Sequence, residues 1–151
     1  MTQVSLNALS KQGRLRTHQT SKNELDSIRA LIQRDLDDAA IEELSSDRRF
    51  ATAYNAVLQL GKMALACAGY RTSSTTGGHH KTTFDALELI LGSAHSQLIT
   101  YFDTCRRKRN QVDYDMAGVA SDADADELVT KVSELQTVIE DWIAKNHSQY
   151  I

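Results

Sequence analysis

Residues 104–115, TCRRKRNQVDYD, hold the densest group of charged and hydrogen-bonding side chains in the chain. A guanidinium next to an amide can bind a phosphate or a base, and neighbouring cations strengthen the local field. Cations are also favoured near the C-terminal end of a helix, by about 0.3–1 kcal/mol each, so a purely structural interpretation stays open. The candidate ligand-binding residues are Arg106, Lys108, Arg109, Asn110 and Tyr114, and the last three are also the candidate catalytic residues.

Arg109 continues a row of apolar residues. Leu98, Phe102 and Cys105 recur at intervals of three and four residues, and Arg109 follows them in the same row. Its guanidinium should therefore point toward the edge of the core or into an interface, where it needs acceptors, because an unpaired buried charge is costly. A two-fold related copy would supply them through one self-complementary patch. We therefore predict a homodimer in which residues 102–114 of both chains border a shared groove.

A second polar stretch, GGHHK at residues 77–81, precedes an expected helix. A glycine-rich turn that leads into a helix can hold an anion, so His79 and His80 are further candidate ligand-binding residues. They could equally hydrogen-bond to backbone or solvent at the start of the helix. Adjacent histidines point roughly 100° apart on a helix, and no acidic residue or cysteine stands three or four positions further on. We therefore predict no metal site and no cofactor.

The composition limits the class of protein. The chain has 151 residues, of which 41% are hydrophobic and none is proline, as expected for one helical domain. Its net charge of −3 gives no global attraction to nucleic acid, so an anion site must be local. The two cysteines, Cys67 and Cys105, lie in apolar patterns, as reduced thiols would. Without a secretory signal or an apolar run of about 18 residues, we expect a cytoplasmic protein that does not enter the membrane.

Helical periodicity and capping residues define the expected elements. We predict an all-α fold, an antiparallel bundle of four to five helices, as a single domain at residues 21–147 after a flexible arm at residues 1–20. No segment with the period of a β-strand is long enough to use. Residues 71–78 lack an apolar anchor and should form a mobile loop. The expected helices span about 21–44, 47–68, 79–92 and 93–112, and the last begins near 122.

Three segments resemble the HEPN domain (higher eukaryotes and prokaryotes nucleotide-binding). RRFATAYNAVLQLGKMALACAGYR resembles its long second helix, GGHHKTTFDALELILG resembles the Gly-His-His stretch that opens the next helix, and RRKRNQVDYD resembles its motif helix. The resemblance covers about residues 47–116. It implies a short helical bundle of the kind found in bacterial toxin–antitoxin and defence systems, with a homodimer and a small nucleotidyltransferase-type protein as candidate partners.

Many HEPN proteins are metal-independent ribonucleases with an arginine, a polar residue, a short spacer and a histidine. The resemblance places Arg109 and Asn110 at the first two positions, but Tyr114 stands where the histidine would be. A phenol, with a pKa near 10, replaces an imidazole poorly in proton transfer. We therefore expect a module that binds RNA, a nucleotide or a cognate protein in a cleft around Arg109, with no catalysis. The alternatives are a weak metal-independent endoribonuclease, with Tyr114 or His80 in place of the histidine, and a helical interaction module without a nucleic-acid role.

Overall fold

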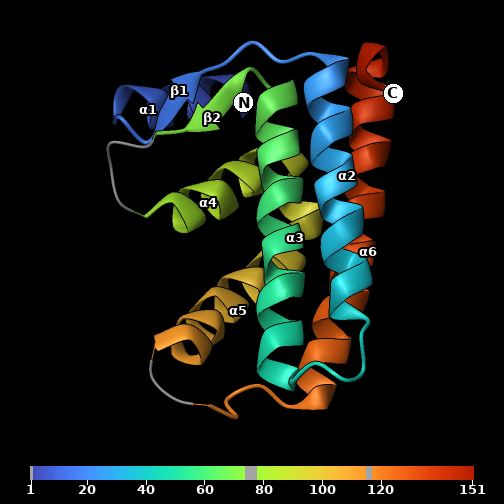
Figure 1. The fold of residues 1–151 in the computed structure, drawn as a ribbon. Helices are drawn as coiled ribbons and strands as arrows, with labels where there is room; N and C mark the ends of the chain where they lie inside the picture. Colours follow the sequence, from blue (N-terminus) through green and yellow to red (C-terminus); the bar gives the residue numbers. More distant parts are fainter. Residues whose placement is uncertain (1, 74–77, 115–116) are drawn as a thin grey trace.

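The computed structural model describes residues 2–73, 78–114 and 117–151, with side chains from Ser5 onward and none described for residues 113 and 114. Most of the described chain is helical, which confirms the predicted all-α class. Three long helices form one side of the molecule: α2 (Lys22–Ala39), α3 (Ser46–Cys67) and α6 (Asp122–Asn146). In Figure 1, α3 and α6 run in the same direction and α2 runs opposite to both.

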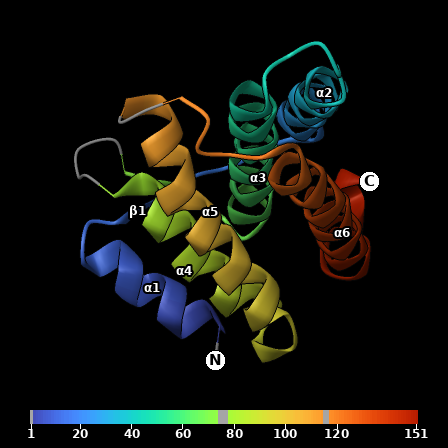
Figure 2. The same cartoon turned by 90° about the horizontal axis from the view of Figure 1, so that it is seen from below.

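Two further helices cover the opposite side of α3. They are α4 (His79–Leu91) and α5 (Ser96–Tyr114), joined by the 3₁₀ turn Ser93–His95. Viewed along α3, they lie between α3 and the N-terminal helix α1 (Thr2–Lys11) (Figure 2). Because α3 contacts helices on both sides, most of its surface is buried, including Tyr54, Val57 and Leu60.

The apolar stripe predicted for residues 21–44 is present, but α2 ends at Ala39. The buried side chains of Leu25, Ile28 and Ile32 follow the predicted spacing. The helix stops because Arg49 of α3 donates from Nε to the Ala39 carbonyl at 2.8 Å, and α3 then begins after its N-cap, Ser45. The side chain of Ser21 accepts the N–H of Glu24, as expected of an N-cap.

The first twenty residues do not form the flexible arm that we predicted. They contain α1 and a short strand, β1 (Leu15–Thr17), which pairs antiparallel with β2 (Tyr70–Thr72). Leu6, Leu9 and Leu15 are buried. Strands of three residues are too short to show a period of two in the sequence, and three widely spaced leucines give a weak helical signal.

The predicted mobile loop at 71–78 is also partly wrong. Its first two residues belong to β2, and the Ser73 N–H donates to the Arg14 carbonyl at 3.0 Å. Residues 74–77 lie outside the described part of the chain. Residues 71 and 72 therefore belong to a strand that the N-terminal segment holds in place.

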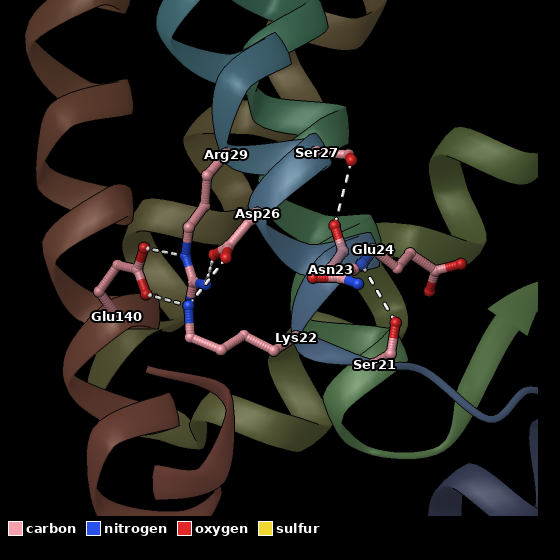
Figure 3. Close-up of polar contacts among 8 residues, drawn as sticks. All are labelled: Ser21, Lys22, Asn23, Glu24, Asp26, Ser27, Arg29 and Glu140. Atoms are coloured by element: carbon pink, nitrogen blue, oxygen red, sulfur yellow. Dashed lines mark hydrogen bonds and ion pairs between the residues drawn. The ribbon is translucent and has the colours of Figure 1, made fainter.

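Ion pairs join α2 to α6 on the side away from α4 and α5. Arg29 of α2 donates from two nitrogens to the two carboxylate oxygens of Glu140 at 2.9 and 3.0 Å, and from a third nitrogen to Asp26 at 2.7 Å (Figure 3). These hydrogen bonds raise the pKa of Arg29, with the bond to Glu140 as the largest cause. Within the described residues, no helix is both long enough and apolar enough to cross a bilayer.

Candidate functional site

The cluster around Tyr54 brings together three helices. Tyr54 of α3 is fully buried, and its hydroxyl lies 3.2 Å from Nδ1 of His80 at the start of α4. Cζ of Arg109, from α5, lies 6.0 Å from the centre of the Tyr54 ring. A guanidinium at that distance is attracted by the negative face of an aromatic ring. We call Tyr54, His80, Arg106 and Arg109 the Tyr54 cluster.

A close approach between α3 and α4 sets the position of His80. A Cβ atom added at Gly61 would lie only 2.3 Å from Cγ2 of Thr83, so a side chain cannot be accommodated there without a shift. Thr83 in turn donates from its hydroxyl to the His79 carbonyl at 2.9 Å. Phe84 packs edge-on against Tyr54 with ring centroids 6.3 Å apart. The absent side chain at Gly61 therefore lets the first turn of α4 approach α3 next to Tyr54.

The electrostatic environment keeps His80 neutral and Tyr54 protonated. Burial lowers the pKa of His80, and the positive charges of Arg109 and Arg106 lower it further. Burial also raises the pKa of Tyr54 well above its ordinary value, although the same two arginines oppose this shift. A neutral imidazole has one nitrogen that can accept a proton. The cluster thus combines two guanidinium groups, a phenol donor and a neutral imidazole.

Arg106 is held on its own helix. Its Nε donates to Asp103 at 2.9 Å, and Arg107 lies 3.8 Å from the same carboxylate. Burial acts to raise the pKa of Asp103, but the hydrogen bond and the positive charge of Arg106 outweigh it, and the pKa falls below its ordinary value. Asp103 therefore stays ionised near neutral pH and orients Arg106, while Arg107 is largely exposed.

The other candidates of the RRKRN stretch do not join the cluster. Nζ of Lys108 forms an ion pair with Asp124 of α6 at 3.0 Å, so it links α5 to α6. Asn110 is exposed. The backbone of Tyr114 ends α5, but its side chain lies outside the described part of the chain, so its predicted role stays a prediction. Helical geometry explains the division, since consecutive residues of α5 point in different directions.

His79 and His80 also line a cavity of about 390 Å³ between α3, β2 and the start of α4. His80 belongs to the Tyr54 cluster and to the cavity, because its Nδ1 faces Tyr54 and its side chain also lines the cavity. Among the described residues there is no group of three or more histidines, cysteines or acids that could hold a metal ion.

Sequence analysis did not single out Tyr54 as a site residue. It is fully buried, but its hydroxyl and its ring face also lie next to the two candidate residues His80 and Arg109. The available signal was its place in the segment RRFATAYNAVLQLGKMALACAGYR, which is expected by resemblance to form a long helix.

Comparisons of the chain with protein-family models, with curated proteins and with solved structures found no match. A functional assignment therefore depends on the geometry and chemistry of the residues themselves.

Proposed function

We propose that the protein is a HEPN-like binding module that takes an RNA or nucleotide phosphate at the Tyr54 cluster. The observation that carries the proposal is the position of Arg109 over the Tyr54 ring, next to His80 and one turn from Arg106. Three side chains from separate helices converge there, which a simple helix-end cap of cations does not require.

The chemistry of the cluster suits a phosphodiester. Guanidinium groups bind phosphate oxygens with paired, charge-assisted hydrogen bonds. The positive charges of Arg109 and Arg106 disfavour protonation of His80. An anion bound beside His80 would offset this repulsion between the imidazolium and the two arginines. Single-stranded RNA offers phosphates together with unstacked bases that can lie on aromatic or guanidinium planes.

A homodimer completes the proposal. Residues 102–114 of two chains would border one groove, and the exposed Asn110 and Arg107 would then face the second copy or its ligand. A cytoplasmic toxin–antitoxin or defence system, with a nucleotidyltransferase-type protein as partner, is the setting that the resemblance implies. Light scattering at micromolar concentration tests the assembly, and a monomer would contradict the shared groove.

Binding of a fluorescent unstructured RNA, measured by anisotropy at low and high salt, tests the function. Arg109→Ala should weaken binding by about tenfold or more, since it removes a charge-assisted contact. Arg34→Ala is the matched control, because Arg34 is an exposed arginine on α2. Equal loss in both variants would show only non-specific attraction, and unchanged binding in Arg109→Ala would reject the site. Absence of any RNA or nucleotide binding would favour a protein-interaction module.

The position of His80 favours a second candidate, a metal-independent endoribonuclease. A neutral imidazole beside Arg109 could accept the proton of an RNA 2′-hydroxyl as that oxygen bonds to phosphorus. The bond to the 5′-oxygen breaks, that oxygen takes a proton from an imidazolium, and the products are a 2′,3′-cyclic phosphate and a 5′-hydroxyl. Incubation with RNA in EDTA should then yield these ends. His80→Asn should abolish cleavage and leave RNA binding intact.

A further inference from the structure

Apolar and polar side chains meet in a cavity beside the start of α4. It lies between the N-terminal end of α2, α3, β2 and the start of α4, and its volume of about 390 Å³ is within the range of small-molecule sites. Leu58, Leu65 and Ala66 form an apolar wall on α3. The polar lining comes from His18, Glu24, Gln59, Lys62, Arg71, Thr72, His79 and His80.

One buried polar atom in the wall has no protein partner. Oε1 of Gln59 is buried and accepts no hydrogen bond from any described residue. Leaving a buried acceptor unsatisfied costs about 1–3 kcal/mol, so such atoms need a reason. Because Gln59 lines the cavity, a ligand that carries a hydroxyl or amino group can supply the missing donor.

The cavity lining contains two cations, Lys62 and Arg71, and Arg16 pairs with Arg71 on the neighbouring strand. In the β1–β2 pair, Arg16 stands directly opposite Arg71, a like-charge arrangement that normally weakens a strand pair. Neither arginine forms an ion pair with a described residue, and neither does Lys62, one turn after Gln59 on α3. In a structural ion-pair network, each cation would contact an acid. Here the neighbouring positive charges repel each other, and a bound anion would reduce that repulsion.

Glu24, the only acid among the described lining residues, already has partners. The Glu24 carboxylate accepts from the Thr20 hydroxyl at 2.7 Å and lies 2.7 Å from Nε2 of His18. These two contacts, the Thr20 bond first, lower the pKa of Glu24, so it stays ionised and bound to them. The charge of Lys62 also lowers the pKa of Glu24, but Lys62 and Arg71 form no ion pair with a described residue, so both can contact a ligand. The lining also includes the start of α4, where Gly78 adopts a left-handed φ of 77° and offers no side-chain cap.

We propose that this cavity binds a small phosphate monoester that carries a hydroxyl or amino group, with Arg71 and Lys62 on the phosphate and Gln59 accepting from the donor. A phosphate monoester has a charge between −1.5 and −2 near neutral pH, roughly what two cations can match. This site shares only His80 with the Tyr54 cluster and does not depend on RNA binding there. His80 lines this cavity and touches Tyr54, so it connects the two places.

Titration with glycerol 3-phosphate, followed by backbone amide shifts, tests the site. Inorganic phosphate, glycerol and acetate serve as comparison ligands. We expect glycerol 3-phosphate to bind more tightly than inorganic phosphate, with the largest shifts at residues 59–62, 71–72 and 79–80. Glycerol and acetate should bind much more weakly. Equal binding of acetate would reject the phosphate class, and absence of binding by glycerol 3-phosphate would reject the site.

Variants separate a binding role from a structural one. Arg71→Gln and Lys62→Met should each weaken binding by about tenfold, whereas Lys131→Met, an exposed lysine of α6, should not. Arg71→Gln should at the same time slightly stabilise the ligand-free protein, because it removes the like charge opposite Arg16. Gln59→Leu should likewise weaken binding without loss of stability. If Arg71→Gln and Gln59→Leu both destabilised the protein as well as weakening binding, the proposal would be overturned.

The pKa of His80, which lines the cavity and contacts Tyr54, provides an independent test of binding in the cavity. A bound phosphate places negative charge beside the imidazole, so it should raise the pKa of His80, measured from the ring proton shifts during a pH titration. The pKa of His147, the C-cap residue of α6, which does not line the cavity, should not change and serves as the internal control. Binding that leaves the pKa of His80 unchanged would place the ligand elsewhere.

Discussion

Two arginines on opposite sides of α3 show how differently one residue type is used in this molecule. Arg29 lies between Asp26 and Glu140, and all its described contacts are to acids on α2 and α6 (Figure 3). Arg109 lies over the ring of Tyr54 and lowers the pKa of His80. The α2–α6 side thus neutralises its charges internally, whereas the α4–α5 side concentrates positive charge around a phenol and an imidazole. The first arrangement is typical of structural pairing and the second favours a ligand.

The largest effect should come from the apolar residues beneath the charged side. Phe102 of α5 is fully buried, and Phe102→Ala should lower the free energy of unfolding by about 3–5 kcal/mol. Arg109→Ala should cost far less stability and should instead weaken anion binding. Urea denaturation measures the first quantity and RNA anisotropy the second. If Arg109→Ala were as destabilising as Phe102→Ala, Arg109 would be a core residue and the contrast with Arg29 would fail.

The close approach of α3 and α4 should give the next largest effect. Gly61→Ala places a methyl group 2.3 Å from Cγ2 of Thr83, and such overpacking costs about 1–3 kcal/mol. Thr83→Ser removes that methyl group but keeps the hydroxyl that donates to His79. The double variant should therefore regain most of the stability lost in Gly61→Ala. Thermal denaturation of the four proteins checks this, and simple addition of the two single effects would contradict the contact.

The ion pair on the α2–α6 side should contribute less. A double-mutant cycle with Arg29→Ala and Glu140→Ala should give a coupling free energy of about 0.5–1 kcal/mol, because both side chains are partly exposed. High salt should reduce this coupling, whereas ligand binding at the Tyr54 cluster should be unchanged in both variants. A change in RNA affinity on loss of Arg29 would show that the two sides are not independent.

The smallest effect concerns the titration of His80. Its folded pKa lies below the ordinary value of 6.5, through burial first and then through Arg109 and Arg106. As the pH falls, the unfolded chain binds a proton on His80 at a higher pH than the folded protein does. The neutral imidazole therefore contributes fully to stability above about pH 6.5, and this contribution is lost as the pH falls from about 6.5 to the folded pKa. Arg109→Ala should raise the pKa of His80 measured by NMR, though not fully, since burial remains. Asn110→Ala, which removes no charge, should leave the value unchanged.

Local signals account for what the sequence could predict. Ser21, Ser45 and the acidic turn after Ser121 mark the starts of α2, α3 and α6 within a residue or two, because capping depends on neighbouring residues only. The row that contains Phe102, Cys105 and Arg109 was likewise predicted, and its first two members are buried. These features need no knowledge of the rest of the chain.

Contacts between distant segments could not be predicted. The pairing of Lys108 with Asp124 depends on the turn between α5 and α6. The meeting of Tyr54 with His80 depends on how closely α3 and α4 approach, which Gly61 and Thr83 determine together. The β1–β2 pair depends on two short segments that have no strand pattern of their own.

The pairing of Leu15 with Thr72 has a consequence for the order of folding during synthesis. The segment of α1 and β1 leaves the ribosome before its strand partner β2, which follows only after α2 and α3 have emerged. Until then Leu6, Leu9 and Leu15 have no core to enter. Closing this long loop carries an entropy cost that only the finished α3–α4 side can offset. The segment of α1 and β1 is therefore made before α3 but reaches its final place after it.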